Sequence, residues 1–365
     1  MKIGLVTYTN TTDNYGQVLQ CLACQEFLKQ NGHEVYVLRL KADKTKKEML
    51  KEKVFSFVRF LFPFLRTEKG RIVAKWQRIA YESEKKHARF FESFRHDVFN
   101  IIEDSYNGLA SLQFDAVASG SDQIWGSVSK WYMLGWTPDI CIRFSLSSSV
   151  GHGTFSKEQI LEARKYLVRY NYISVRETNG VELCNRCGVK STLLLDPTFL
   201  LTKEDYLQFV NSKVKNTPRR YIFVYLVGAD IPIDIKEIFN FAERYNLDVK
   251  YVESQGRNEH VEEKNYATVP EWINLINNSS YVITNSFHGM AFAIIFRKQF
   301  LSIPITGVFS SMNLRITDLA IQTQLEPHIY TGKLDVLFDP IDWTTVEMAI
   351  KDNFRKINCL NNILR

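Results

Sequence analysis

The sequence has little that would place it in a membrane. Its 365 residues contain no apolar run approaching the roughly 20 residues that a membrane-spanning helix needs. Residues 1–8 form a short, apolar, strand-like run that turns polar at Thr9, which is not the pattern of a secretory signal. We therefore expect a cytoplasmic protein. A peripheral position on the inner face of the cell membrane stays open.

The chain also lacks a strong excess of one charge. It has 46 Lys and Arg against 40 Asp and Glu, a formal net charge of +6 at pH 7. This excess is too small to indicate nucleic-acid binding, and we expect no nucleic-acid partner. It is equally compatible with an anionic substrate and with an anionic membrane surface.

Two further absences argue against a cofactor. The first strand-to-helix turn lacks the Gly-x-Gly-x-x-Gly pattern of dinucleotide sites. The pairs Cys21/Cys24 and Cys184/Cys187 have a Cys-x-x-Cys spacing that can hold zinc. However, Cys21 and Cys24 lie in an apolar helical pattern, where small buried cysteines are common, whereas zinc ribbons place such pairs on tight turns. We predict neither a metal nor a cofactor.

Short apolar runs alternate with amphipathic runs along most of the chain, which is typical of parallel α/β folds. Two such sets are separated by the polar, patternless residues 211–219. We predict an N-terminal Rossmann-like domain over 1–210 and a second one over 219–342, facing each other across a cleft. A helix over 343–365 could return to the first domain. The strands are expected at 2–8, 33–40, 114–119, 140–146, 172–175, 220–227, 248–252 and 281–284.

Residues 43–97 interrupt the α/β rhythm, and we predict a helical insertion there. Ten Lys and Arg lie between Lys44 and Lys75, against three Glu. The Phe-rich run 54–65 places its apolar residues on one helical face, and Pro63 should kink or end that helix. Such a helix can lie in a membrane interface. A helical hairpin that covers the sheet or a partner subunit is the favoured alternative.

The most informative stretch is residues 281–304, which read as strand, helix and strand. The polar turn Thr284–Gly289 joins the first strand to the helix and carries Ser286 and His288. Ligands of open parallel sheets bind at the carboxyl ends of strands, and a helix start offers free N–H groups to an anion. A capping Ser beside a structural His is the competing interpretation.

Other polar turns follow predicted strands in the first half of the chain. Arg176 opens a helix after the strand 172–175, where its planar guanidinium would suit a carboxylate or phosphate. The remaining turns are Asn14-Tyr15-Gly16, Gly120-Ser121-Asp122-Gln123-Ile124-Trp125 and Asp196-Pro197-Thr198.

Taken in order and spacing, these turns resemble the polysaccharide pyruvyl transferase family over nearly the whole chain. The resemblance implies a two-lobed fold like that of glycosyltransferases of type B. It also implies transfer of pyruvate from phosphoenolpyruvate to two hydroxyls of a sugar, giving a cyclic ketal. The acceptor would belong to a surface polysaccharide or its lipid-linked precursor, and the sugar cannot be identified from the sequence.

We assign roles on this basis. His288 fits a general acid, because imidazole titrates near neutral pH, and Asp122 is the candidate base. Some family members carry Arg at the position of Ser286, so the donor needs cations from elsewhere. The predicted donor-binding residues are Arg176, Arg315, Ser286, Phe287, Gly289 and Lys298. The predicted acceptor-binding residues are Asn14, Tyr15, Gln17, Ser121, Gln123 and Trp125.

Two other functions remain open. One is a nucleotide-sugar glycosyltransferase of the same architecture, which would release a nucleotide rather than inorganic phosphate. The other is a non-catalytic binding protein on this fold. The presence of His288, Arg176 and Asp122 argues against the second alternative.

Overall fold

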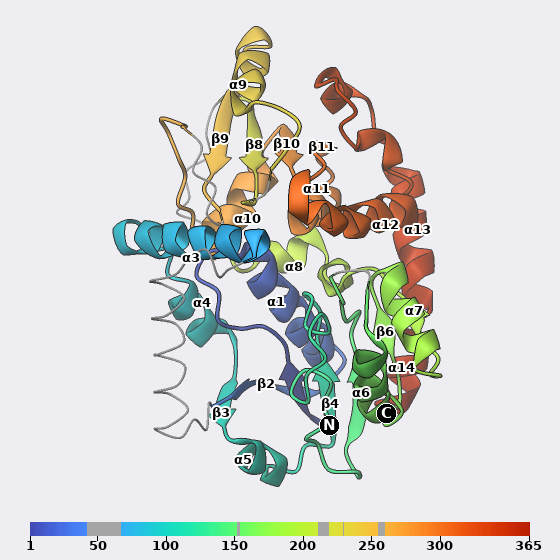
Figure 1. The fold of residues 1–365 in the computed structure, drawn as a ribbon. Coiled ribbons are helices and arrows are strands. Elements are labelled where there is room, and N and C mark those ends of the chain that lie inside the picture. Colours follow the sequence, from blue (N-terminus) through green and yellow to red (C-terminus); the bar gives the residue numbers. More distant parts are fainter. Residues whose placement is uncertain (42–66, 152–153, 211–218, 229, 255–259) are drawn as a thin grey trace.

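The computed structural model describes residues 1–41, 67–151, 154–210, 219–228, 230–254 and 260–365. Two parallel sheets lie in separate lobes (Figure 1). The N-lobe sheet has the order β3-β2-β1-β4-β5. Its strands are β1 (Lys2–Val6), β2 (Glu34–Leu40), β3 (Ile101–Asp104), β4 (Ala116–Ser119) and β5 (Ile142–Ser145). Single bridges join its edge to the short pair β6 (Ser174–Val175) and β7 (Thr192–Leu193).

The C-lobe sheet has the order β11-β10-β8-β9, and all its pairings are parallel. Its strands are β8 (Tyr221–Tyr225), β9 (Asp248–Val252), β10 (Tyr281–Thr284) and β11 (Gln299–Ser302). Every residue of β8 is buried, as expected for a central strand covered on both faces.

Helices cover the sheets and connect the lobes. In the N-lobe they are α1 (Tyr15–Gln30), α3 (Glu68–Lys86), α4 (Phe91–Val98), α5 (Tyr106–Ser111), α6 (Lys157–Leu167), α7 (Thr178–Arg186) and α8 (Lys203–Leu207). In the C-lobe they are α9 (Ile235–Arg244), α10 (Val269–Asn278), α11 (Phe287–Ile295) and α12 (Asn313–Thr323). The chain ends with α13 (Trp343–Arg355) and α14 (Asn358–Ile363). The 3₁₀ turns are η2 (Pro197–Leu200), η3 (Gly307–Met312), η4 (Glu326–His328) and η5 (Asp335–Phe338).

The last two helices run beside the N-lobe, close to α7 and β6 (Figure 1). The Asn353 side chain of α13 accepts a hydrogen bond from the backbone of Leu195 at 2.8 Å. Leu360 of α14 is fully buried in the same apolar cluster as Leu195. The C-terminal segment therefore contributes to the N-lobe core.

The lobes share one continuous apolar core at the start of α1. The Tyr15 ring stacks on Trp272 of the C-lobe, with centroids 5.4 Å apart, and lies 5.7 Å from the ring of Tyr225. The Tyr15 hydroxyl donates a 2.5 Å hydrogen bond to the Ala267 carbonyl. Because all these side chains are buried, the first turn of α1 is fixed against the C-lobe.

The sequence predicted most of these elements, with several exceptions. The helical insertion predicted over 43–97 is interrupted near Phe90, whose φ of 55° breaks the helical path between α3 and α4. The strand β3 and the helix α5 were not predicted. After β11, residues 307–312 form the 3₁₀ turn η3, and α12 begins at Asn313. The Phe-rich segment 54–65 and most of the expected linker lie outside the described residues.

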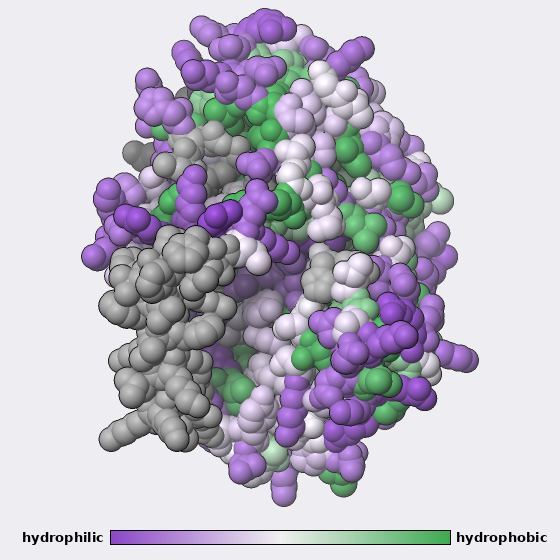
Figure 2. Space-filling view, in the orientation of Figure 1, coloured by the Kyte–Doolittle hydropathy of each residue, from purple (hydrophilic) through white to green (hydrophobic). Residues whose placement is uncertain are grey.

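Within the described residues, no helix has both the length and the apolar character needed to cross a bilayer. Figure 2 shows hydrophilic side chains over much of the visible face and a recess between the two lobes.

The shared core predicts a strong dependence of stability on Trp272. This side chain is fully buried, and Trp272→Ala should lower the free energy of unfolding by about 3–5 kcal/mol, because a large cavity replaces its packing. Urea denaturation followed by circular dichroism measures the change. Ile140→Ala is the control, since Ile140 is 94% exposed and should alter stability by less than about 0.5 kcal/mol. If the two substitutions lowered the free energy of unfolding equally, Trp272 would not be a core residue that joins the two lobes.

Candidate active site

The turn between β10 and α11 is held rigidly at the carboxyl end of the C-lobe sheet. The Thr284 hydroxyl donates to the Tyr225 carbonyl at 2.6 Å and accepts from the backbone N–H of Ser286 at 3.0 Å. Asn285 bonds both backbone groups of Val227 in the neighbouring connection. The Ser286 hydroxyl caps α11 by accepting from the Gly289 N–H at 3.3 Å. The helix therefore begins at a fixed point, with its positive end at the sheet edge.

A buried ion cluster lies on the N-lobe side of this turn. Arg176, directly after β6, donates from Nη1 to Asp196 Oδ2 at 2.5 Å and from Nε to Glu177 Oε2 at 3.1 Å. Its Nη1 also reaches Ser121 Oγ at 3.2 Å. Burial alone would raise the pKa of Asp196, but the adjacent guanidinium holds that pKa well below its ordinary value. Asp196 is therefore a permanent anion in the folded protein.

This cluster supports His288 of the opposite lobe. His288 Nε2 lies 3.8 Å from Asp196 Oδ2, too far for a hydrogen bond but close enough for attraction when the imidazole is protonated. The Phe287 ring lies 4.4 Å from the guanidinium carbon of Arg176, a cation–π contact. On its other side His288 packs against Gly16, where an added Cβ would overlap the imidazole ring. Gly16 is needed for this close approach of α1 and α11.

A narrow cavity opens between the lobes in front of His288. The residues that line it are Asn14, Asp122 and Gln123 from the N-lobe and Val227, Asn285, Ser286, Phe287, His288, Ile305, Met312, Arg315 and Ile316 from the C-lobe. The cavity thus collects the helix-cap serine, the histidine, one carboxylate and one guanidinium from distant parts of the sequence.

Arg315 is the cation of this cavity. It lies in the first turn of α12 and is 7% exposed. Within the described residues its guanidinium makes no hydrogen bond or ion pair, and its Nε is fully buried. Burial, and then the nearby charge of Arg176, lowers the pKa of Arg315 to about 10, so it remains charged at neutral pH. A buried, unpaired cation is costly and calls for an anionic partner.

Asp122 is placed by an unusual backbone turn after β4. Asp122 and Gln123 both have left-handed φ angles, 64° and 59°. Such residues cost about 1–3 kcal/mol each and cluster at functional sites. The turn brings the carboxylate, which is 5% exposed, to the same cavity as His288 and Arg315.

Several predicted site residues do not reach the cavity. Tyr15 and Trp125 are fully buried, and their polar atoms bond to Ala267 and Ser119, so neither can touch a substrate in this arrangement. Lys298 donates to the Ser279 carbonyl at 2.9 Å and does not line the cavity. The motifs around Tyr15 and Trp125 correctly indicated turns, but these two side chains pack in the protein interior.

Other predicted residues support the site from behind. Arg176 and Ser121 lie beneath the cavity in the ion cluster, and only the Arg176 Nη2 has no hydrogen-bond partner among the described residues. Gly289 packs against Thr284, leaving no room for a Cβ there, so its role is packing in the turn. Gln17 accepts from the Thr11 N–H at 3.1 Å and braces the loop before α1.

Two carboxylates of the ion cluster received no role from the sequence. Asp196 contacts both Arg176 and His288, and Glu177 also accepts from Ser149 and from the backbone of Val150 and Gly151. Asp196 directly follows a short apolar run, the position that marked the other turns. Its proximity to His288 depends on the packing of the two lobes, which no local pattern encodes.

The cysteine pairs lie in packing positions. Cys21 and Cys24 are buried in α1, and Cys184 and Cys187 are buried at α7. In the described part of the chain, no group of three or more His, Cys, Asp or Glu could hold a metal ion.

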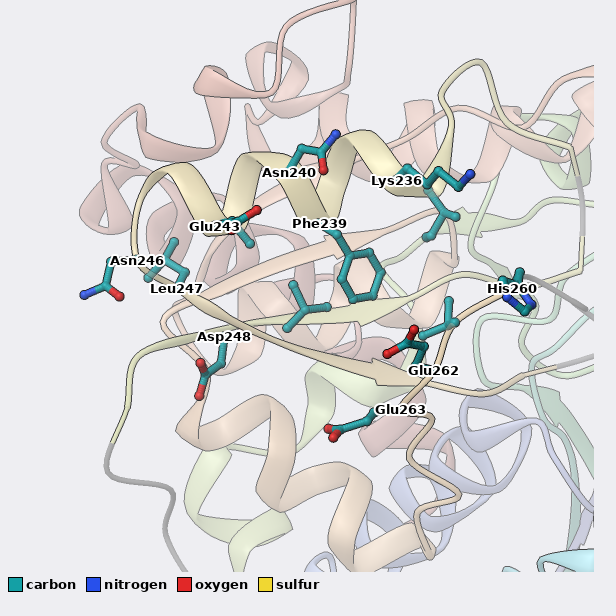
Figure 3. Close-up of a pocket in the computed structure, with 14 residues that line it drawn as sticks. Lys236, Phe239, Asn240, Glu243, Asn246, Leu247, Asp248, His260, Glu262 and Glu263 are labelled. Carbon is teal, nitrogen blue, oxygen red and sulfur yellow. The ribbon is translucent and has the colours of Figure 1, made fainter.

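A larger hollow, of about 640 Å³, lies away from this site beside α9 (Figure 3). Phe239 projects from α9 toward the segment that carries Glu262 and Glu263. Carboxylates dominate its charged rim, and Lys236 is the only Lys or Arg among the described residues that line it. An acidic rim disfavours an anionic donor, so this hollow is not the candidate active site.

The buried ion cluster predicts a pH-dependent loss of stability in Arg176→Gln. Without the guanidinium, burial would raise the pKa of Asp196 above its unfolded value instead of leaving it depressed. At pH 7 the free energy of unfolding of the variant should be about 3–5 kcal/mol lower than that of the wild type. This difference should shrink at lower pH, because acid protonates the unpaired Asp196. Urea denaturation of both proteins at pH 5, 6 and 7 measures how this stability difference changes with pH.

The matched control is Arg355→Gln. Arg355 pairs with Asp352 on the surface, where the side chains are 79% and 62% exposed, so its loss should be below about 1 kcal/mol. A deficit of Arg176→Gln that stayed constant between pH 5 and pH 7 would refute the role of Asp196.

Several solved structures are similar to this chain. A putative UDP-N-acetylglucosamine 2-epimerase from Listeria monocytogenes matches with a TM-score of 0.52 and 11% identity, over 100% of this chain and 94% of that one. UDP-GlcNAc 2-epimerase from Methanocaldococcus jannaschii matches with a TM-score of 0.45 and 9% identity, over 96% and 93%. The E. coli heptosyltransferase WaaC with ADP-2-deoxy-2-fluoro heptose matches with a TM-score of 0.35 and 10% identity, over 83% and 88%. At these identities the likeness concerns the fold alone.

The two parallel sheets in separate lobes and the match to the Listeria monocytogenes protein confirm the predicted two-lobed α/β fold, similar to that of type B glycosyltransferases. No curated protein gives a significant sequence match. The family comparison is more specific, because the family of polysaccharide pyruvyl transferases matches residues 14–306. This range includes cavity residues of both lobes, whereas Arg315 lies beyond it. This chain belongs to the polysaccharide pyruvyl transferase family.

Proposed function

We propose that this protein transfers pyruvate from phosphoenolpyruvate onto two hydroxyls of one sugar in a surface polysaccharide or its lipid-linked precursor. The observation that carries the proposal is the unpaired, buried Arg315, which shares a cavity with His288 and Asp122 at the start of α11. A small donor with two anionic groups suits a site with one guanidinium that is unpaired among the described residues and one helix N-terminus.

The donor would bind with its anionic groups on the C-lobe side. Arg315 offers a complete guanidinium to one of them, and the first turn of α11 offers its N-terminal dipole to the other. Arg176 contributes less directly, because Asp196 and Glu177 already engage two of its nitrogens. Its Nη2 has no hydrogen-bond partner among the described residues, but it is buried beneath the cavity.

The chemistry begins with a proton transfer to the methylene carbon of the donor. His288 supplies the proton, the methylene becomes a methyl group, and positive charge develops at the neighbouring carbon. One sugar hydroxyl attacks that carbon, and Asp122 accepts its proton. Phosphate leaves with its bonding electron pair, and a second hydroxyl closes the ring and releases its own proton. The products are the cyclic ketal and inorganic phosphate.

Asp196 acts in this scheme as a positioning residue. Its carboxylate is fixed by Arg176 and by Thr198, whose N–H and hydroxyl donate at 3.0 and 2.8 Å. A fixed anion 3.8 Å from His288 Nε2 holds the imidazole in place beside the cavity. Arg176 keeps Asp196 ionised, so Asp196 does not take the proton that His288 supplies.

Donor binding should depend on Arg315. Arg315→Gln removes the unpaired charge, and the dissociation constant for phosphoenolpyruvate should rise about 10–100-fold, as for loss of a hydrogen bond to a charged group. Isothermal titration calorimetry measures it. Lys298→Gln is the control, because Lys298 lies off the cavity and should leave affinity within about twofold of the wild type. The assignment of Arg315 fails if the two variants bind alike.

Turnover should depend on His288. His288→Ala should reduce kcat by about 10²–10⁴-fold, the usual contribution of a general acid. In deuterium oxide the wild-type reaction should place one deuterium in the ketal methyl group, which mass spectrometry detects. The exposed His96→Ala serves as the control. A His288→Ala enzyme with turnover within a few-fold of the wild type would leave His288 a structural role only.

Product analysis also distinguishes pyruvyl transfer from the alternative function, a nucleotide-sugar glycosyltransferase. The fold neighbour from Listeria monocytogenes bears the name of a UDP-sugar enzyme. Release of a nucleotide from a nucleotide sugar, with no phosphate released from phosphoenolpyruvate, would favour a glycosyltransferase on this scaffold.

A further inference from the structure

Helix α12 carries Arg315 on the side that contacts the N-lobe. Arg315, Asp318 and Gln322 are spaced three and four residues apart, so they lie on one side of this helix. Arg315 lines the cavity, whereas Asp318 and Gln322 contact N-lobe residues that are not among its lining residues. We call Arg315, Asp318 and Gln322 the α12 face. The proposed chemistry uses only Arg315 of this face.

Asp318 caps a helix of the other lobe. Its Oδ2 accepts from the backbone N–H of Thr178 at 2.7 Å and from the Thr178 hydroxyl at 3.0 Å. Thr178 is the first residue of α7, and the N-terminal N–H groups of a helix have no partner within it. The preceding Glu177 gives no side-chain cap, because its carboxylate is engaged by the loop 149–151 and by Arg176. A carboxylate from the C-lobe therefore caps α7, at the positive end of its dipole.

A second contact of the α12 face lies one turn further along the helix. Gln322 Nε2 donates a long hydrogen bond, of 3.5 Å, to the Arg176 carbonyl. Gln322 Oε1 accepts from Asn353 of α13 at 3.2 Å, and Asn353 in turn accepts from the Leu195 N–H. Leu195 directly precedes Asp196. The α12 face is thus attached to both backbone segments that form the Arg176–Asp196 ion pair.

Arg315 needs such an attachment, because its own surroundings do not hold it. It lies in the first turn of α12, where the positive end of the helix dipole disfavours a cation. The charge of Arg176 also repels it, and Arg315 forms no ion pair with any residue that the structure describes. An unpaired guanidinium is more stable in water than in a buried site. The helix that carries it must therefore be fixed by contacts elsewhere.

We propose that Asp318 is a positioning residue for the donor: by capping α7 of the N-lobe, it holds Arg315 in the cavity beside His288 and Asp122. This inference rests on the proposed pyruvyl transfer, because Arg315 is the residue assigned to bind phosphoenolpyruvate. Asp318 does not touch the donor and acts through the placement of α12. Gln322 contributes to the same placement through a longer hydrogen bond.

Calorimetry with phosphoenolpyruvate tests this role. Asp318→Ala should raise the dissociation constant about fivefold, the change in an equilibrium constant that is typical for loss of one helix cap. Asp318→Asn should bind within about twofold of the wild type, because an amide oxygen can accept both hydrogen bonds from Thr178. If Asp318→Ala binds the donor as tightly as the wild type does, the positioning role is overturned.

A double-mutant cycle separates positioning from general destabilisation. Asp318→Ala introduced into the Arg315→Gln variant should cause no further loss of affinity, because the guanidinium that Asp318 positions is then absent. Equal losses in the wild-type and Arg315→Gln backgrounds would mean that Asp318 acts on the fold and not through Arg315, which would overturn the proposal.

Asp342→Ala is the matched control. Asp342 is an exposed residue that caps α13 by accepting from the backbone N–H groups of Thr344 and Thr345 at 3.0 and 3.3 Å. It does not line the cavity. Its loss should lower the thermal stability but leave the dissociation constant within about twofold of the wild type. A loss of affinity as large as that of Asp318→Ala would show that removal of any cap weakens binding, and the proposal would fail.

Amide hydrogen exchange tests the same attachment without a ligand. In Asp318→Ala, peptides that cover the start of α7 and the start of α12 should both exchange faster than in the wild type, because each helix loses its contact with the other. In Asp342→Ala neither peptide should change. If both peptides exchange in Asp318→Ala as they do in the wild type, Asp318 does not fix α12 and the proposal fails.

The two measurements distinguish this inference from the proposed function. If the wild type binds no phosphoenolpyruvate while both helix starts lose protection in Asp318→Ala, the attachment of α12 by Asp318 stands and pyruvyl transfer fails. If phosphoenolpyruvate binds equally to the wild type and to Asp318→Ala, its role as the donor stands and the positioning role of Asp318 fails.

Discussion

The ion pair between Arg176 and Asp196 is the constraint on which the site depends. Both side chains are almost fully buried, so each charge would be untenable without the other. The pair fixes the ends of two N-lobe segments and binds Ser121 from a third. It also presents a permanent negative charge to His288 of the other lobe. One interaction thereby orders the N-lobe edge and sets the electrostatic environment of the proposed acid.

The two arginines consequently differ in function despite their proximity. Arg176 is neutralised by Asp196 and Glu177, whereas Arg315 forms no ion pair with any residue that the structure describes. The helix α12 that carries Arg315 is itself anchored to the N-lobe. Asp318, one turn later, accepts from the N–H and hydroxyl of Thr178 at 2.7 and 3.0 Å. The free cation is therefore held at a fixed distance from the ion cluster.

The sequence could predict whatever depends on local patterns. The strand–helix–strand unit from β10 to β11 could be predicted, because the spacing of apolar residues, the helix-capping serine and the polar turn all indicate the same structure there. It could not separate Asn14, which lines the cavity, from its neighbour Tyr15, which packs against Trp272. Nor could it show that Asp196 meets His288, since that contact spans 92 positions and two lobes. Long-range packing decides which side chains of a polar turn face a ligand.

The contact between α1 and α11 links the packing of the two lobes to the position of His288. Tyr15 anchors the start of α1 in the shared core, and Gly16, the next residue, allows the His288 ring to lie against that helix. Movement of one lobe relative to the other would therefore displace His288 from Asp196 and Arg315 from Asp122 together. The cavity between them is walled by residues of both lobes, so its shape depends on the same contact.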